Sequence, residues 1–329
     1  MRETDHDLIP SEDVGRECGR WHMRIFLTGL SGYLGSVLAE YLARQPDVET
    51  ITGIDISSPK DPLPEKVRFQ QMDIRSPELS DAVAGHDAII HTAFIVLWPA
   101  RIPERVRDDI NLNGIRNVAQ AAVNNRVQHF VHLSSTAAYD PTQVVNHTNV
   151  KEDFPLGKGD SFFYYSNGKA LAEKTLAEVL GPSNVKLTIL RPTYVIGPKN
   201  RDTIPSLRKS SVKIPGIDPF VQYIHEDDVA AAVLLALQRN MPGAYNLVPD
   251  DCIYLSEVIK IIGVKRVPAV PLWLARWIVA IRWRYFGSLV HHSWVDVTYS
   301  SSSFSNAKLK AGGWQPHYSS REALCSALK

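Results

Sequence analysis

The sequence predicts an α/β fold, in which a doubly wound parallel sheet carries helices on both faces and a smaller lobe completes the chain. Short apolar runs alternate with helical patterns up to about residue 197, which is the order expected of strand–helix units. A glycine-rich turn joins the first apolar run to the first helical pattern. With 329 residues, 44% of them hydrophobic, the chain can bury a large core.

Charge and cysteine content narrow the class of protein. The formal net charge of +1 gives no sign of a nucleic-acid partner. The cysteines Cys18, Cys252 and Cys325 are odd in number and widely spaced, so we expect no disulfide framework and a reducing, cytoplasmic location. Residues 1–22 are polar and lack an apolar segment, so we expect a disordered tail rather than a signal peptide.

The histidines do not form a pattern typical of a metal site. His91 and His225 occur where structural hydrogen bonds are expected, and the adjacent His291 and His292 would point in different directions on any regular element. We therefore expect no metal.

The first element is a strand over residues 23–28, and it leads directly into a turn with glycines at 29, 32 and 35. A helical pattern follows. In this arrangement the glycines permit a tight turn and let backbone amides approach a pyrophosphate at the helix N-terminus. The spacing is G-x-x-G-x-x-G, and the turn is the first part of an expected dinucleotide site. Its residues are Gly29, Ser31, Gly32, Tyr33, Leu34 and Gly35.

The second strand, over residues 50–54, ends in Asp55, 26 positions after Gly29. A carboxylate there can accept hydrogen bonds from the ribose hydroxyls of the adenosine. It would also repel a 2′-phosphate, and no arginine follows it directly; Lys60 is too distant to assign. NAD is therefore favoured over NADP.

A third strand is expected over residues 67–72, and Asp73 and Ile74 follow it. Two interpretations of Asp73 stay open. It could flank the adenine together with Ile74, or it could cap a helix before Ser76.

Tyr165 and Lys169 stand four residues apart, a spacing that places two side chains on one face of a helix. A phenol with a pKa of about 10 is a poor acid or base near neutrality, but an adjacent ammonium group lowers that pKa. Such a tyrosine can exchange a proton with a substrate oxygen. Tyr164 competes by proximity, yet only Tyr165 has a lysine four residues on.

Several further segments occur in the order seen in one known family. They are residues 87–93, a strand ending in small residues; 111–118, a helix starting with Asn111; 131–139, a strand followed by hydroxyl residues; and 191–198, the run RPTYVIGP. With the glycine turn, they make the chain resemble the extended short-chain dehydrogenase/reductase superfamily, which includes nucleotide-sugar epimerases, dehydratases and 3β-hydroxysteroid dehydrogenases. The resemblance runs from about residue 23 to the C-terminus and is strongest before residue 230.

The resemblance implies a Rossmann-type fold and an NAD-dependent enzyme. It implies Ser135, Tyr165 and Lys169 as catalytic residues, with Ser135 chosen because it lies four residues before Tyr139. It further implies Asn111 as a structural residue and a homodimer formed through helices at about 104–125 and 164–180. Cofactor contacts are implied for Thr92, Ala93, Pro192 and Val195, besides Tyr165 and Lys169.

Departures from the family pattern restrict the substrate. Dehydratases of this superfamily carry an acidic pair just after the catalytic hydroxyl residue. No acidic pair follows Ser135 here. Many nucleotide-sugar enzymes carry an arginine near the position of Gln222, and here the run is Phe-Val-Gln. We expect hydride transfer to or from a secondary alcohol or ketone of an apolar, non-nucleotide substrate. The alternatives are a nucleotide-sugar 4-epimerase and a non-catalytic NAD-binding regulatory protein.

The C-terminal region is rich in aromatic residues. They are Trp273, Trp277, Trp283, Tyr285, Phe286 and Trp294. Three interpretations are possible, in order of preference: the core of the small lobe, the lining of an apolar pocket, and contact with a membrane surface. Interspersed arginines argue against a membrane span. We expect residues 23–198 and 222–248 to form the NAD-binding domain, and 199–221 and 249–329 to form the substrate lobe.

Overall fold

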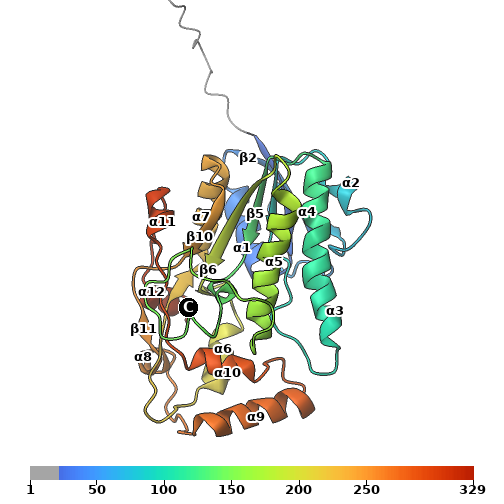
Figure 1. Cartoon of the computed structure of the whole chain (residues 1–329). Helices are drawn as coiled ribbons and strands as arrows, with labels where there is room; N and C mark the ends of the chain where they lie inside the picture. The colour runs from blue at the N-terminus through green and yellow to red at the C-terminus, as the bar shows by residue number, and fades with distance from the viewer. Residues whose placement is uncertain (1–21) are drawn as a thin grey trace, which may run out of the picture.

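The computed structural model describes residues 22–329, so nearly all of the expected tail lies outside the described residues. A seven-stranded sheet forms the centre (Figure 1), in the order β10-β6-β5-β4-β1-β2-β3, and every neighbouring pair is parallel. Its strands are β1 (Met23–Thr28), β2 (Val48–Asp55), β3 (Val67–Gln71), β4 (Ala88–His91), β5 (His129–Leu133), β6 (Lys186–Pro192) and β10 (Gly243–Leu247). The predicted parallel sheet is confirmed.

The core has two layers, one on each face of the sheet, because successive side chains of a strand point to opposite faces. On β1, Ile25 and Leu27 join the layer under α1 (Tyr33–Ala43) and α7 (Glu226–Arg239). Phe26 joins the opposite layer, which α2 (Leu79–Val83), α4 (Gly114–Asn124) and α5 (Tyr164–Leu180) cover. Helices therefore lie on both faces, as predicted (Figure 1).

The helix that precedes and includes α4 is continuous but irregular. A short α3 (Glu104–Asp108) runs into a turn of π-helix, η1 (Asp109–Asn113), and then into α4. Ile115, Val118 and Ala122 are buried at the three- and four-residue spacing of an amphipathic helix. Gly114 begins α4 where a Cβ would overlap the side chain of Ile74, so a larger residue here would displace Ile74.

The smaller lobe lies beyond the carboxyl ends of the strands (Figure 1). It contains α6 (Thr203–Ser210), β8 (Phe220–Val221), β11 (Ile253–Tyr254), α8 (Leu255–Ile261), α9 (Leu272–Tyr285) and α10 (Ser293–Thr298). A short parallel pair, β7 (Tyr194–Ile196) and β9 (Tyr223–His225), connects it to the sheet domain.

The end of the chain returns to the sheet domain. Leu309, on α11 (Ala307–Ala311), and Trp314 belong to the same buried cluster as α1 and α7. The buried carboxylate of Asp228 accepts hydrogen bonds from the backbone N–H groups of His317 and Tyr318, just before α12 (Ser320–Ser326). Leu309 and Trp314 thus contribute to the core of the larger domain, although the sequence places them with the lobe. Ala323 and Leu324 of α12 instead pack in a lobe cluster with Val258 and Ile262.

Within residues 22–329, no helix is both long and apolar enough to cross a bilayer. The same part of the chain holds no cluster of three or more potential metal ligands among its histidine, cysteine and acidic side chains.

Candidate active site

The glycine turn lies at the point where the strand order reverses, between β1 and β4. Gly29 has a φ of +79°, and a Cβ at this position would lie 2.7 Å from both the amide nitrogen of Ala93 and Oγ1 of Thr92. A Cβ on Gly35 would overlap the Gly29 carbonyl. The turn is therefore closed tightly against the end of β4, and α1 begins immediately after it. This is the geometry that lets a helix N-terminus bind a pyrophosphate.

Asp55 lies at the end of β2 beside this turn. Its carboxylate accepts hydrogen bonds from the backbone N–H groups of Ser31, at 3.2 Å, and Ser57, at 3.1 Å. The Ser31 hydroxyl also donates to the Ser57 carbonyl oxygen, at 2.6 Å. The structure thus brings Ser31 and Asp55 together as predicted, and a carboxylate in this place suits the ribose of an NAD molecule.

Tyr33 and Leu34 contribute to the turn in a different way from the glycines. The Tyr33 hydroxyl donates a 2.6 Å hydrogen bond to Oε2 of Glu226, the first residue of α7. Leu34 packs against the core under α1. Both side chains have partners within the protein, so the predicted cofactor contacts at these two positions stay a prediction and would involve their backbone.

Residues 92–96 connect the two halves of the site. Thr92 donates from Oγ1 to the Thr28 carbonyl oxygen beside the glycine turn, at 2.7 Å. Phe94 lies with its ring 4.0 Å from the Lys169 ammonium and 5.9 Å from the Tyr165 ring. Asn111, in the π-helical turn, exchanges two hydrogen bonds with the backbone of Ile95 and so holds this segment in place. That is the structural role expected of Asn111.

Tyr165 and Lys169 lie on the first two turns of α5, with Ser135 opposite them at the end of β5. The Lys169 ammonium is buried and donates to the Leu133 carbonyl oxygen, at 2.9 Å. The hydroxyl of Ser135 accepts a 3.1 Å bond from the backbone N–H of Ala137, which fixes the short turn η2 (Thr136–Ala138). The three predicted catalytic residues therefore come together, from two elements that are 30 residues apart in the sequence.

The electrostatics of the pair differ from the sequence-based expectation. Burial raises the pKa of Tyr165 to about 12, although a hydrogen bond with Ser135 acts in the opposite direction. Burial also lowers the pKa of Lys169 to about 7, while the nearby Glu173 carboxylate opposes that change. The Lys169 ammonium lies 6.0 Å from the centre of the Tyr165 ring and is directed to a carbonyl oxygen. The expected lowering of the Tyr165 pKa is therefore wrong for this structure, because burial raises that pKa and Lys169 is not among the groups that shift it.

Tyr164 is not an alternative to Tyr165. Its hydroxyl donates to the Val96 carbonyl oxygen, at 2.7 Å, and accepts from Nε1 of Trp294, at 3.1 Å. It therefore ties α5 to residues 92–96 and to the lobe.

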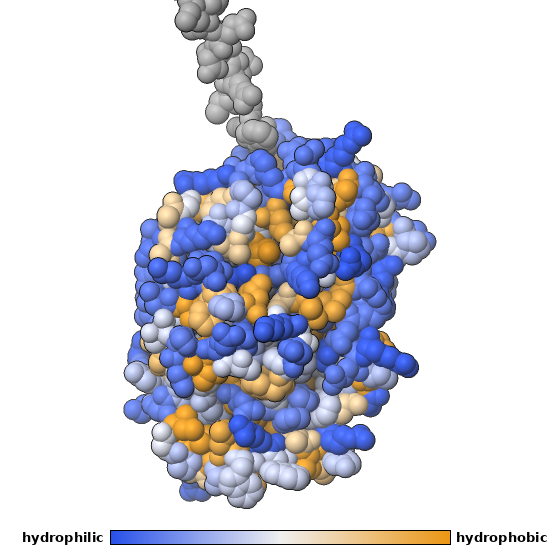
Figure 2. Space-filling view, in the orientation of Figure 1, coloured by the Kyte–Doolittle hydropathy of each residue, from blue (hydrophilic) through white to orange (hydrophobic). Residues whose placement is uncertain are grey.

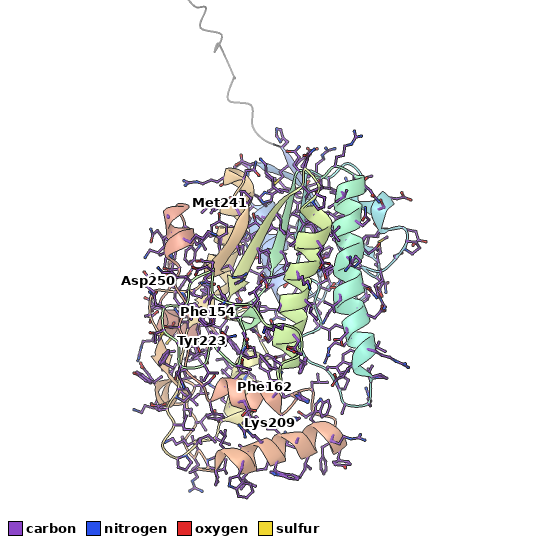
Figure 3. All side chains as sticks on the ribbon, viewed as in Figure 1. Phe154, Phe162, Lys209, Tyr223, Met241 and Asp250 are labelled. Carbon is purple, nitrogen blue, oxygen red and sulfur yellow. The ribbon has the colours of Figure 1, made fainter. Side chains whose placement is uncertain are left out.

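The lobe encloses the Tyr165 ring with aromatic side chains. Trp294, on α10, stacks on it with ring centres 5.4 Å apart, and Phe163 meets it edge-on at 5.9 Å. The adjacent Phe162 is exposed at the end of α5 that faces α10 (Figure 3). Trp283 donates from Nε1 to the Trp98 carbonyl oxygen, at 2.8 Å, and so holds the other side of the enclosure.

The other four C-terminal aromatics do not form a lobe core. Trp273, Trp277, Tyr285 and Phe286 expose between 62% and 76% of their surface. The preferred interpretation, that the aromatics build the core, is therefore wrong for these four, because α9 buries only Ala275.

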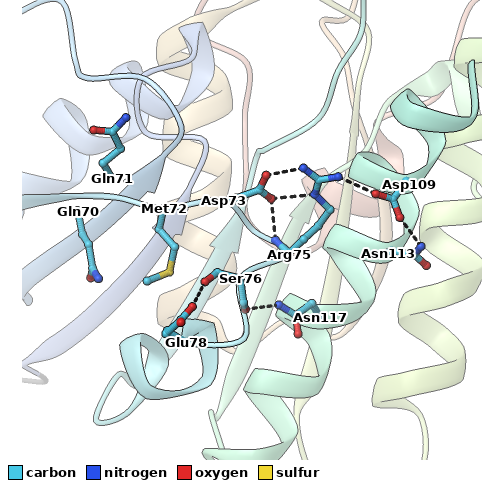
Figure 4. Close-up of a pocket in the computed structure, with 10 residues that line it drawn as sticks. All are labelled: Gln70, Gln71, Met72, Asp73, Arg75, Ser76, Glu78, Asp109, Asn113 and Asn117. Carbon is cyan, nitrogen blue, oxygen red and sulfur yellow. Dashed lines mark hydrogen bonds and ion pairs between the residues drawn. The ribbon is translucent and has the colours of Figure 1, made fainter. Parts of the chain in front are cut away.

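Asp73 and Ile74 lie at the far end of the sheet, past β3. Asp73 lines an open polar cavity of about 910 Å³ between β3 and the start of α4 (Figure 4). Its carboxylate binds the Arg75 guanidinium, which lowers the pKa of Asp73. Ile74 is buried against Gly114. The helix-cap interpretation of Asp73 is wrong, because α2 begins at Leu79 and the carboxylate instead bonds the backbone N–H of Arg75.

Pro192 and Val195 lie on the two sides of the junction that follows β6. Pro192 is buried at the end of the strand, opposite Leu247 of β10. Val195 pairs with Ile224 and packs on the core under α1 and α7. Their predicted contacts with the nicotinamide stay a prediction.

A buried polar network that was not predicted from the sequence supports the predicted catalytic residues. Arg191 of β6 forms a bidentate pair with Glu173 of α5, at 3.0 and 2.7 Å, and the hydroxyl of Ser134 donates to the same carboxylate, at 2.5 Å. Glu173 lies one turn beyond Lys169 on the same helix face. Its four-residue spacing from Lys169 was the available signal.

Gln222 is turned into the protein. Its amide donates to the Pro249 carbonyl oxygen, at 3.0 Å, and accepts from the backbone N–H of Phe304, at 2.8 Å. Both polar atoms of the Gln222 amide are therefore used by backbone groups of the protein.

Comparison with known proteins places these features in a family. The model described as "NAD dependent epimerase/dehydratase family" matches residues 25–247. The short-chain dehydrogenase/reductase family 42E member 1 of Xenopus laevis is 29% identical over 65% of this chain and 58% of its own length. The sterol-4-alpha-carboxylate 3-dehydrogenase ERG26 of Candida albicans is 25% identical over 65% of this chain and 64% of its own length. This chain thus covers less than two thirds of these two relatives.

A solved structure supports the fold. The Bordetella bronchiseptica enzyme WbmG in complex with NAD superposes with a TM-score of 0.72 at 21% identity, over 93% of each chain. The family match also confirms the predicted enzyme class and NAD as the family's cofactor. The matched residues include the glycine turn with Asp55 beside it. They also include Ser135, Tyr165 and Lys169 at the adjacent strand and helix ends. The chain therefore belongs to the NAD dependent epimerase/dehydratase family.

Proposed function

We propose that the chain transfers hydride between NAD and a secondary alcohol or ketone of an apolar, non-nucleotide substrate. The observation that carries the proposal is the environment of Tyr165. Its ring contacts Trp294, Phe163 and Phe94, so a substrate carbonyl approaching the hydroxyl would be surrounded by aromatic surface. Pockets of this kind favour apolar ligands oriented by a few polar groups.

NAD, when bound, supplies the hydride acceptor or donor. In the direction of ketone reduction, Tyr165 would donate its phenolic proton to the substrate oxygen, and the Ser135 hydroxyl would donate a hydrogen bond to the same oxygen. The raised pKa of Tyr165, about 12, keeps this proton in place at neutral pH. Lys169 would orient the cofactor ribose with the ammonium protons that its bond to Leu133 leaves free.

Two features argue against known reactions of sugar nucleotides. The turn η2 after Ser135 carries no acid for the water elimination of a dehydratase. Gln222, where many nucleotide-sugar enzymes carry an arginine, is hydrogen-bonded to backbone groups of Pro249 and Phe304. The name of the ERG26 relative includes a sterol, which is an apolar secondary alcohol. This supports the same substrate class for the present chain.

The test is a substrate screen with purified protein and NAD. We expect NADH to form, by absorbance, with sterol-like or other apolar secondary alcohols. UDP- and dTDP-sugars form the second arm. Inversion of a sugar without net NADH would overturn the proposal in favour of a 4-epimerase. Binding of NAD without turnover in either arm would favour a regulatory protein.

We also propose a homodimer in which α4 and α5 pair with the same helices of a second copy. The two helices pack against each other on one face of the sheet. Sedimentation of the purified chain tests the dimer. The cytoplasmic location stays a separate part of the proposal.

A further inference from the structure

The outer face of α9 is apolar and uncovered in the described part of the chain. Trp273, Trp277, Ile281 and Tyr285 recur every four residues and so lie along one side of the helix. Trp273 and Trp277 are 62% and 64% exposed. The apolar surface continues through the loop after α9, where Phe286, Leu289 and Val290 are also exposed. We call α9 with residues 286–290 the α9 face.

The opposite side of α9 is occupied. Ala275, with Leu272 and Val279 at helical spacing, packs against Ile214 and Val295. Arg276 forms an ion pair with Asp296 of α10. The inner side of α9 thus holds the helix on the lobe. The exposed aromatics lie on the other side and are not part of this packing. Figure 1 shows α9 as the outermost element at the lobe end of the molecule, and Figure 2 shows orange and pale residues interspersed with blue ones there.

Basic residues predominate around the α9 face, and Asp296, the first acidic residue after α9, is paired with Arg276. Residues 258–295 contain no aspartate or glutamate. The same stretch contains six basic residues, namely Lys260, Lys265, Arg266, Arg276, Arg282 and Arg284. Arg282 and Arg284 form no ion pair with any part of the chain that the structure describes. Lys209 at the end of α6 (labelled in Figure 3) and Lys213 add exposed positive charge on the same lobe.

Exposed aromatics with unpaired arginines are the combination that binds a lipid headgroup region. Tryptophan and tyrosine prefer the boundary between water and hydrocarbon, and arginines attract anionic phosphates. The 14-residue helix is about 21 Å long, too short for a hydrocarbon core of about 30 Å, so it would lie along the surface. A second copy is a poorer occupant, because a symmetric contact would bring the same arginines against each other.

We propose that the α9 face docks on the surface of a membrane that contains anionic phospholipid. Membrane contact is the least favoured of the three interpretations on sequence alone, and the exposure of Trp273 and Trp277 favours it over a lobe core. The inference does not depend on the proposed reaction, since it concerns the outer side of α9 only.

The experiment is vesicle flotation with the full chain. Vesicles of phosphatidylcholine alone are compared with vesicles that contain about 30% phosphatidylglycerol as the anionic lipid. We expect binding to the anionic vesicles that weakens at about 0.5 M salt, where surface charges are screened. Tryptophan fluorescence should shift to shorter wavelength on binding, because Trp273 and Trp277 leave water.

Two double variants separate the contributions. Trp273→Ser/Trp277→Ser should lower the vesicle partition coefficient by about tenfold or more through loss of buried apolar area. Arg282→Gln/Arg284→Gln should lower it by roughly tenfold or more on anionic vesicles. The matched control is Arg68→Gln/Arg126→Gln, which removes two exposed arginines from the sheet domain and should leave the partition unchanged.

The proposal is overturned if the wild-type chain does not float with anionic vesicles at low salt, or if the tryptophan variant floats as well as wild type. A sedimentation shift to a dimer that Trp273→Ser/Trp277→Ser abolishes, without vesicle binding, would also overturn it and assign the α9 face to a second copy. Circular dichroism and the melting temperature verify that both variants are folded.

Discussion

The indole of Trp294 stacks on the ring of Tyr165, with centres 5.4 Å apart and planes inclined by 27°. The same indole donates from Nε1 to the Tyr164 hydroxyl, and that hydroxyl donates to the Val96 carbonyl oxygen. A single side chain from the lobe therefore contacts the proposed acid and also ties together the helix and the loop beside it.

Removal of this indole should weaken substrate binding more than catalysis. We expect Trp294→Ala to raise KM for an apolar substrate by about tenfold, because one aromatic contact and its buried area are lost. Trp294→Phe should keep the stacking and lose only the bond to Tyr164, so its KM should lie closer to that of wild type. Steady-state kinetics of both variants test this, and an unchanged KM in Trp294→Ala would place the substrate elsewhere.

Tyr165→Phe should reduce turnover by roughly 10² or more, as expected for loss of acid/base help. NAD binding, measured by calorimetry, should persist because the glycine turn and Asp55 are untouched. The control is Tyr164→Phe, which loses the bonds to Val96 and Trp294 but not the proton donor. Near-normal turnover in Tyr165→Phe would show that the acid/base assignment is wrong.

Glu173→Gln should change the pH dependence of ketone reduction. Burial lowers the pKa of Lys169 to about 7, and the Glu173 carboxylate acts in the opposite direction. Removal of the negative charge should therefore lower that pKa further and move the alkaline limb of the rate profile to lower pH. Glu178→Gln, an exposed position on the same helix, is the matched control. A loss of stability with an unmoved profile would limit Glu173 to a structural role.

Two buried histidines should make the fold sensitive to acid. Burial lowers the pKa of His91 from 6.5 to about 3 and that of His132 well below its ordinary value. Both are neutral in the folded state, so the unfolded chain binds more protons below pH 6.5. We expect His91 to lower the free energy of unfolding by about 1.4 kcal/mol per pH unit as the pH drops from 6.5 toward 3, and His132 to act in the same direction.

Replacement of His132 tests this directly. Neither of its ring nitrogens has a hydrogen-bond partner among residues 22–329. His132→Leu should therefore stabilise the protein by about 1 kcal/mol or more near neutral pH and reduce the dependence on acid. The exposed His147→Asn is the control. Urea unfolding at several pH values measures both effects, and a variant less stable than wild type at pH 7 would contradict the prediction.

The sheet domain could be predicted from local patterns. The strands, the glycine turn and Asp55 follow from period, spacing and order, because each strand–turn–helix unit is specified by residues close in sequence. Tyr165 and Lys169 were found in the same way, from their four-residue spacing on α5.

The enclosure of the site could not be predicted in this way. Trp294 reaches Tyr165 from 129 positions further along the chain, and no local pattern indicates which aromatic of the lobe turns inward. The pKa of Tyr165 was mispredicted for a related reason. Spacing shows that a lysine is near, whereas burial, which decides the direction of the change, depends on elements that are distant in sequence.

The hydrogen bonds from His317 and Tyr318 to the buried Asp228 hold the C-terminal segment on the sheet domain. A truncation after β10 would remove both donors from a carboxylate that has no access to solvent, and would strip Leu309 and Trp314 from the core. Anyone who wishes to exchange the substrate lobe for that of a relative should therefore place the second junction before about residue 305. The native C-terminal segment would then keep its contacts with the sheet domain, and the new lobe would have to supply apolar partners for Ala323 and Leu324 of α12.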